Sequence, residues 1–154
     1  MRVLDTRRIR RGVAAVEAAI VVPVFLTTVL GMLDLSIGVM RQNILSQAAR
    51  HAARQAIVHG QLCPASWNGG PWGTATTDVA ASSDSVPIVQ AIRPFLVGCD
   101  LGSSRIIVEW PDGNNELESR VRVTVTSPYQ PMMTFIFGNP TFTLRATSTM
   151  SIAH

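Results

Sequence analysis

The chain has 154 residues, which is enough for one ordinary domain with an appendage. Apolar residues make up 47% and charged residues 15%, a balance that favours membrane association over disorder. The formal net charge of +3 arises at the N-terminus: residues 1–12 carry five arginines and one aspartate, whereas residues 13–154 carry a net charge of −1. The basic balance is therefore a property of a short leader, and we expect no nucleic-acid partner.

The first element after this basic leader is a predicted transmembrane helix over residues 13–34. The apolar run Val13–Leu33 covers roughly 30 Å as a helix, which matches the hydrocarbon core of a bilayer. A signal peptide that is removed has a shorter apolar region, about 7–15 residues, and a small-residue cleavage site that residues 31–34 lack. Because the leader's arginines precede the span, the positive-inside tendency places residues 1–12 in the cytoplasm and exports the C-terminal body.

Glu17 lies inside this apolar segment, about one turn from its start. A carboxylate in hydrocarbon costs several kcal/mol unless it is protonated, paired or close to the interface. One interpretation is an interfacial acid in an ordinary anchor. The other is that the chain is cut between Gly12 and Val13, so that the new α-ammonium group of Val13 pairs with Glu17 on the same or an adjacent helix. A glycine at the cut suits a peptidase that needs extended backbone without a bulky side chain.

The helical pattern continues over residues 35–60, where it becomes amphipathic. Arginine and glutamine occupy the other faces, so this half of the helix is compatible with water. Gly60 is expected to end the helix. The apolar stripe consists of Ile44, Leu45, Ala48, Ala52, Ala56 and Ile57.

The middle of the chain has less pattern. Residues 61–84 are rich in Gly, Pro, Ser and Thr and are predicted to form an irregular surface loop, followed by a short helix over residues 85–93. In an exported domain Cys63 and Cys99 could form a disulfide, and two unrelated buried thiols are the alternative. We expect no metal site, since His51, His59 and Cys63 lack the spacing of paired ligands.

Strands follow, over residues 105–110, 120–126 and 141–150. Residues 120–126 alternate cleanly, with Val121, Val123 and Val125 on one face. Residues 141–150 alternate too, which places Phe142, Leu144, Ala146 and Met150 on one face. The predicted fold is therefore α+β: a small antiparallel sheet whose apolar face is covered by the stripe of the long helix.

The connection over residues 127–140 is unusually apolar. It is expected either to fold back over the sheet as a plug or to form an exposed contact for a neighbouring subunit or a membrane surface. Its large apolar residues are Met132, Met133, Phe135, Ile136 and Phe137.

These features together resemble the TadE-like minor pilins of the tight-adherence (Tad) pilus, a type IV pilus-like system. The N-terminal part of the resemblance combines a basic leader, Gly12 and the glutamate five residues later. Ala18 departs from the family pattern, in which an aromatic residue usually follows the glutamate. The similar segments are RRGVAAVEAAIVVPVFLTTVLGMLDL, QNILSQAARHAARQA, VRVTV, PYQP and FTLRATSTM.

The resemblance implies a pilin-like subunit that is cut after Gly12 by a membrane prepilin peptidase and takes part in pilus assembly for surface attachment. The implied partners are other pilin and pseudopilin subunits, the inner-membrane assembly machinery and the lipid bilayer. The implied location is the inner membrane, with a single span, a cytoplasmic N-terminus and an exported domain, and the pilus is the second location that the resemblance allows. Asp34 is expected to be a solvated residue at the membrane boundary. The family has an acid at the matching place, so the other interpretation is that Asp34 makes a contact in assembly.

An uncleaved, signal-anchored binding module that does not polymerise remains the alternative. We expect no enzyme, because none of the three histidines lies in a nucleophile motif and no phosphate-binding glycine loop precedes a helix. We also expect no cofactor.

Overall fold

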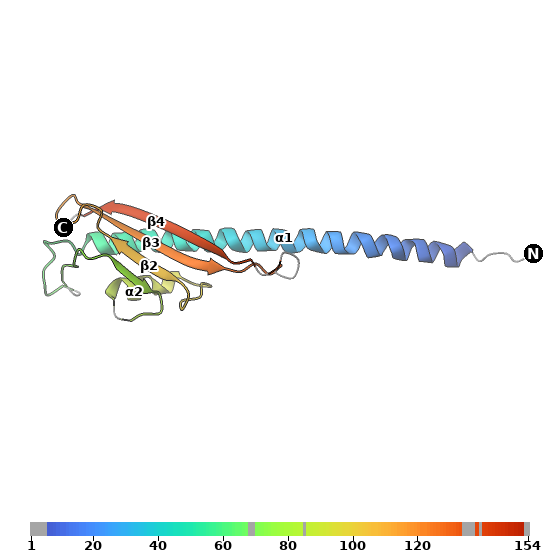
Figure 1. Cartoon of the computed structure of the whole chain (residues 1–154), viewed down its shortest axis with the longest axis horizontal. Coiled ribbons are helices and arrows are strands. Elements are labelled where there is room, and N and C mark those ends of the chain that lie inside the picture. The colour runs from blue at the N-terminus through green and yellow to red at the C-terminus, as the bar shows by residue number, and fades with distance from the viewer. Residues whose placement is uncertain (1–5, 68–69, 85, 134–137, 139, 153–154) are drawn as a thin grey trace, which may run out of the picture.

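The computed structural model describes residues 6–67, 70–84, 86–133, 138 and 140–152, with residues 6–11 described for their backbone only. One long helix projects far beyond a small domain (Figure 1). The predicted α+β fold, a long N-terminal helix packed on a small antiparallel sheet, is confirmed. The elements are α1 (Thr6–Ile57), β1 (Thr77–Ala80), α2 (Pro87–Ile92), the 3-10 helix η1 (Arg93–Phe95), β2 (Arg105–Glu109), β3 (Arg120–Tyr129) and β4 (Phe142–Ser151).

Helix α1 has 52 residues without interruption, which corresponds to a rod of roughly 78 Å. It begins at Thr6, so part of the basic leader continues the helix, and Pro23 lies inside it. The side chains of residues 12–29 in α1 are exposed all round, and none of the helix's most apolar window is buried inside the protein. This helix is long and apolar enough to cross a membrane.

The four strands form one sheet in the order β1-β2-β3-β4, and each neighbouring pair is antiparallel. The three predicted strands are confirmed, and β3 runs three residues further than expected, to Tyr129. The β3–β4 ladder has ten residue pairs, from Arg120↔Ser151 to Tyr129↔Phe142. It lies along α1 and points its Tyr129–Phe142 end toward the projecting half of the helix (Figure 1).

The expectation of an irregular loop over residues 61–84 is wrong at its end, where β1 forms. This strand is short and half-buried, so its sequence carries little alternation. It pairs with β2 from Thr77↔Val108 to Ala80↔Arg105, and Arg105 forms a 2.9 Å ion pair with Asp78 across the two strands. The pairing with β2, rather than the local pattern, therefore decides that this segment is a strand.

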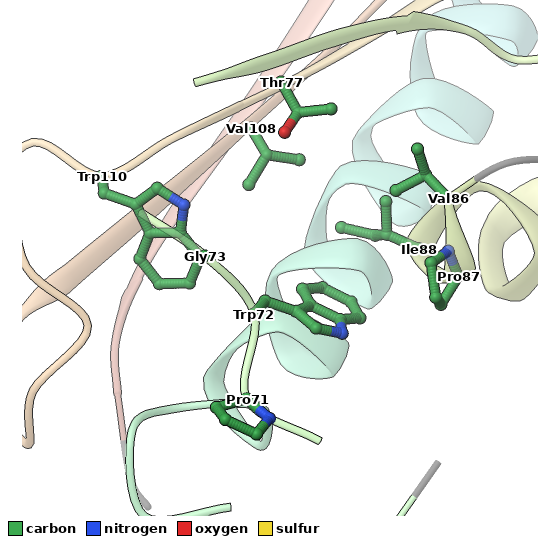
Figure 2. A pocket seen from close by; sticks show the side chains of 9 residues that line it. All are labelled: Pro71, Trp72, Gly73, Thr77, Val86, Pro87, Ile88, Val108 and Trp110. Atoms are coloured by element: carbon green, nitrogen blue, oxygen red, sulfur yellow. The ribbon is translucent and has the colours of Figure 1, made fainter. Parts of the chain in front are cut away.

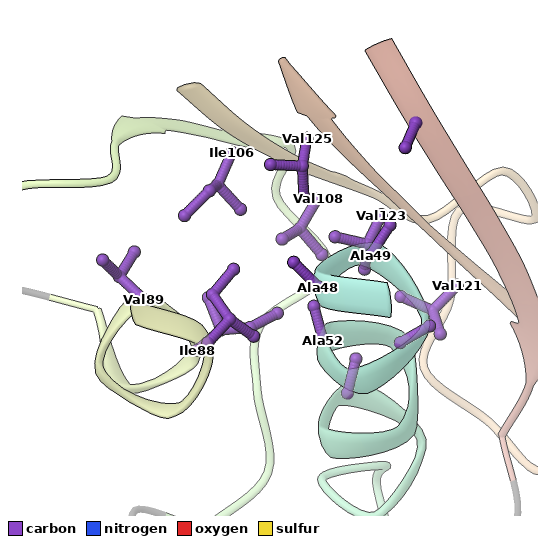
Figure 3. Close-up of a cluster of buried hydrophobic side chains, with 14 of the residues drawn as sticks. Ala48, Ala49, Ala52, Ile88, Val89, Ile106, Val108, Val121, Val123 and Val125 are labelled. Carbon is purple, nitrogen blue, oxygen red and sulfur yellow. The ribbon is translucent and has the colours of Figure 1, made fainter. Parts of the chain in front are cut away.

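The core lies between α1, α2 and one face of the sheet (Figure 3). The predicted stripe of α1 is confirmed at Leu45 and its alanines, and five alanines of this helix are fully or almost fully buried. The valines predicted on one face of β3 are buried against them, and α2, which matches the expected short helix, adds Ile88 and Val89. The buried alanines are Ala48, Ala49, Ala52, Ala53 and Ala56. Because alanine has no side chain beyond Cβ, α1 can approach the sheet closely.

We predict that Ala52→Leu destabilises the domain, because three more carbon atoms do not fit between α1 and the sheet. The free energy of unfolding should fall by about 1–3 kcal/mol, which denaturant titration of the full chain in detergent would measure. Arg50→Leu adds the same side chain on an exposed face of α1 and serves as the control. Equal stability of the two variants would contradict close packing at Ala52.

Candidate functional site

The bond between Gly12 and Val13 lies on the projecting part of α1, well away from the domain. Both residues are helical and exposed, and a Cβ atom added at Gly12 would meet no other atom within 4 Å. The bond is therefore accessible from all sides, but its backbone is helical rather than extended.

Glu17 is exposed on the same helix, one turn beyond Val13. Val13 and Glu17 line a shallow, mostly apolar face of α1, together with Gly12, Val16 and Ile20. Among the side chains that the structure describes, no cation forms an ion pair with Glu17. Its carboxylate thus stands on an apolar helix surface without a charged partner from this part of the chain.

Asp34, at the other end of the apolar segment, has a different environment. It is buried, so the expectation of a solvated boundary residue is wrong. The backbone N–H of Met132 donates to Oδ1 at 2.8 Å, and that of Met133 donates to Oδ2 at 2.9 Å. The hydroxyl of Tyr129 donates to the backbone carbonyl of Asp34 at 3.0 Å and lies 3.4 Å from Oδ1. We call Asp34, Tyr129, Met132 and Met133 the Asp34 clasp.

Two glycines of α1 lie beside the clasp, where an added methyl group would be in ordinary van der Waals contact with it. A Cβ atom at Gly31 would lie 3.7 Å from the Met133 sulfur, and one at Gly38 would lie 3.6 Å from Cε1 of Tyr129. Gly31, Asp34 and Gly38 are spaced so that they share one helix face. Larger side chains at the two glycines would separate the helix from the chain segment that follows β3.

Tyr129 is the centre of the clasp on the sheet side. Burial raises the pKa of its phenol above the usual value, and the nearby Asp34 carboxylate raises this pKa further. The Arg41 guanidinium lies 5.1 Å from the centroid of the ring, a cation–π contact from the next turns of α1. The phenol therefore stays protonated and available as a donor at neutral pH.

The described part of the connection after β3 has features of both interpretations, the plug over the sheet and the exposed contact. Met133 is buried, as a plug requires, whereas Met132 is exposed, as a contact requires. Phe135, Ile136 and Phe137 lie outside the described residues. Beside the clasp, an apolar groove of about 1040 Å³ runs between α1 and the start of β4. Its lining includes Leu35, Gly38, Val39, Pro131 and Phe142.

Cys63 and Cys99 are free thiols in the structure and have different surroundings. Cys63 is buried, and its Sγ lies 3.8 Å from Nδ1 of His59. The His59 ring stacks on Trp72 with 4.5 Å between ring centroids, and its Nδ1 lies 2.9 Å from the Gly70 carbonyl oxygen. Cys99 is half-buried at the edge of the core. Both cysteines thus have packing roles in this structure.

A second pocket, of about 290 Å³, lies between residues 71–73, the start of α2 and the end of β2 (Figure 2). Trp72 and Trp110 flank it, Thr77 provides its side-chain hydroxyl, and no acid, histidine or cysteine is part of its lining. Within the described residues, no group of three or more His, Cys, Asp or Glu is placed to hold a metal ion. The residues with the strongest functional signal in this structure are therefore the two acids at the ends of the apolar helix segment, Glu17 and Asp34.

Sequence reasoning missed Tyr129, Gly31 and Gly38 as partners of Asp34. A signal was present, since glycines three residues before and four residues after an acid mark a helix face to which another segment can approach. Nothing in the sequence pairs that face with the end of β3.

We predict that Asp34→Asn weakens the domain–helix contact. An amide offers one acceptor oxygen, so either the Met132 or the Met133 N–H would face an NH₂ group and lose its hydrogen bond. The expected loss is about 1–3 kcal/mol of unfolding free energy, measured on the full chain in detergent. Ser36→Ala, which removes only a local bond from Ser36 to the Met32 carbonyl, is the control and should be close to neutral. A neutral Asp34→Asn would contradict the clasp.

Comparison with known proteins supports the assignment of the helix. A family model described as TadE-like protein matches residues 12–54, which is nearly all of α1. Comparisons with curated proteins and with solved structures gave no match. The predicted resemblance thus agrees with the family model over residues 12–54, where the helix is similar to TadE-like proteins.

Proposed function

We propose that this chain is a minor pilin or pseudopilin that is cut between Gly12 and Val13 and takes part in assembly of a tight-adherence pilus used for surface attachment. The observation that carries the proposal is the TadE-like match over a helix that is exposed and apolar through its first half. A helix of this kind is stable only in a bilayer or among other apolar helices. In the proposed function, the helix lies in a bilayer before assembly and among other apolar helices after it.

The proposed cut explains two properties of the N-terminal end, namely the basic leader and the glutamate in the apolar segment. Removal of residues 1–12 takes five arginines away from the helix, so that the apolar segment can leave the bilayer and pack among other helices. The new ammonium group at Val13 then neutralises the exposed Glu17, on the same or a neighbouring subunit. The pairing would set the register of the subunit in the assembly.

The proposed partners follow from this sequence of events. They are a prepilin peptidase, other pilin and pseudopilin subunits and the assembly machinery of the inner membrane. Before assembly the protein is a single-pass protein of that membrane, with the N-terminus in the cytoplasm and the domain outside. The proposed role is not enzymatic and needs no cofactor, and the packed α1–sheet unit serves to present a surface.

Cleavage requires the helix to unwind at Gly12, because a peptidase binds extended backbone. Glycine makes this unwinding easier, since it is about 1 kcal/mol less favourable in a helix than alanine. We predict that Gly12→Leu leaves the leader attached, because it adds a bulky side chain at the bond and strengthens the helix there. Mass spectrometry of protein from the native host should find Met1 retained in this variant and Val13 as the first residue of the unchanged chain.

Ala19→Leu adds the same side chain further along the helix and should be cut normally. Gly12→Ala strengthens the helix with a methyl group only and should be cut more slowly than the unchanged chain. Retention of residues 1–12 in the unchanged chain, in a host with active peptidase, would contradict the proposal and favour an uncleaved anchored module.

We predict that Glu17→Ala is still cut but enters sheared pili, or complexes with pilus subunits, less than the unchanged chain does. The scissile bond is intact, whereas the partner of the Val13 amine is lost. Glu17→Gln keeps the shape without the charge and should behave like Glu17→Ala. Normal recovery of both variants by pull-down would show that the charge pair has no role in assembly.

A further inference from the structure

We propose that the end of the domain next to the projecting half of α1 is embedded in a bilayer. The bilayer is the one that α1 crosses, and the embedded end lies in its outer leaflet. The surface concerned, the apolar collar, consists of exposed side chains from α1 and from the two ends of the β3–β4 connection. Its members are Leu35, Val39, Met40, Met132 and Phe142. The inference rests on the membrane anchoring that the proposed function includes, and it is independent of cleavage and pilus assembly.

The first support is the distribution of charge along α1. Between Glu17 and Arg41, Asp34 is the one ionisable side chain in the sequence. The clasp buries it and provides a donor to each carboxylate oxygen. The surface that α1 presents to its surroundings is therefore free of charge from residue 18 to residue 40, a rise of roughly 35 Å. That is more than the roughly 30 Å of a hydrocarbon core.

Two of the hydroxyl groups on this surface are bonded within α1 itself. The Thr28 hydroxyl donates to the Val24 carbonyl and the Ser36 hydroxyl donates to the Met32 carbonyl, both at 2.9 Å. Side chains that satisfy themselves on their own helix are tolerated in lipid. Ser36, which lies beyond Asp34, therefore does not mark the end of the membrane-facing surface.

The second support is the position of the collar. If residues 13–33 fill the hydrocarbon core, Leu35 to Met40 lie roughly 3–10 Å beyond it, within the interfacial layer. Phe142 is brought to the same level, since it pairs with Tyr129, whose hydroxyl binds Asp34. Leu35, Val39 and Phe142 line one apolar groove of about 1040 Å³. The collar thus continues the surface of the span without a break and is large enough to accept acyl chains.

The third support is the charge that follows the collar. Arg41 is the first ionisable residue of α1 after Asp34. Arg145 is exposed on β4 at a similar level, because its carbonyl accepts a 2.9 Å hydrogen bond from Gln42. Two arginines at this height match the phosphate layer of the leaflet, where cationic side chains are favoured. An apolar collar followed by two arginines fits a lipid surface, which has an apolar core and a phosphate layer. The apolar helix of a second copy would offer no phosphate groups to the arginines.

Cysteine accessibility can test the inference on the full chain. Single cysteines replace Met132 and Phe142, with Leu62 and Leu117 as controls, in a Cys63→Ala, Cys99→Ser background whose folding is checked by circular dichroism. Each pair is matched, since Met132 and Leu62 are both 70% exposed in the protein and Phe142 and Leu117 are 53% and 55% exposed. Leu62 and Leu117 lie at the other end of the domain, where the Asn115 carbonyl accepts a bond from the Gln61 N–H.

The proteins are placed singly in nanodiscs of phosphatidylethanolamine with a minority of phosphatidylglycerol and labelled with a charged maleimide. We expect labelling at Met132→Cys and Phe142→Cys to be about tenfold slower than at the matched controls, because lipid excludes the reagent and suppresses the reactive thiolate. A difference smaller than about threefold would overturn the inference. Protection that appears only in discs with several copies would also overturn it, since a second copy would then cover the collar.

Leu26→Cys separates this inference from the proposed anchoring. Protection at Leu26→Cys together with free labelling at Phe142→Cys would overturn the collar and leave the membrane span intact. Free labelling at both positions would overturn both.

Discussion

The structure depends on the burial of one carboxylate, that of Asp34, where the projecting helix meets the domain. A buried charge is costly unless its hydrogen-bonding capacity is used. Here the donors are the N–H groups of Met132 and Met133, which belong to the segment after β3. Because Tyr129 binds the helix backbone at the same place, the end of the sheet is tied to the middle of α1. The rod and the domain are thereby joined at two levels, the clasp and the alanine-lined core.

The alanine-rich face of α1 and the clasp have complementary effects on the helix. The alanines allow close and extensive contact but give little directional preference, since they present a nearly smooth surface. The clasp supplies direction, because hydrogen bonds to a carboxylate and a phenol have defined geometry. Gly31 and Gly38 lie against Met133 and Tyr129 on the same helix face, where only a small side chain fits. The same helix can therefore be lipid-facing along one half and a core element along the other.

The sequence predicted the long helix, the alternating strands and the stripe that covers the sheet, because each of these depends on local periodicity. It did not predict β1, whose pairing with β2 is a tertiary contact. It placed Asp34 in solvent for a similar reason: the donors that bury it come from residues about a hundred positions away. Phe142 was expected on the buried face and is exposed, because the β3–β4 ladder continues past the edge of the core to reach the clasp. Long-range contacts thus account for what local pattern missed.

The two acids of the apolar segment differ in how their charge is compensated, and this difference bears on function. Asp34 is compensated by donors of its own chain, so it creates no demand for another molecule. Glu17 stands on an exposed helix face, and the described side chains provide it with no cation. Within the described residues, one acid is therefore satisfied by its own chain and the other faces the surroundings of the helix. Under the proposed cut, this asymmetry would let the fold be complete before assembly, while assembly would depend on the charge that the cut creates at Val13.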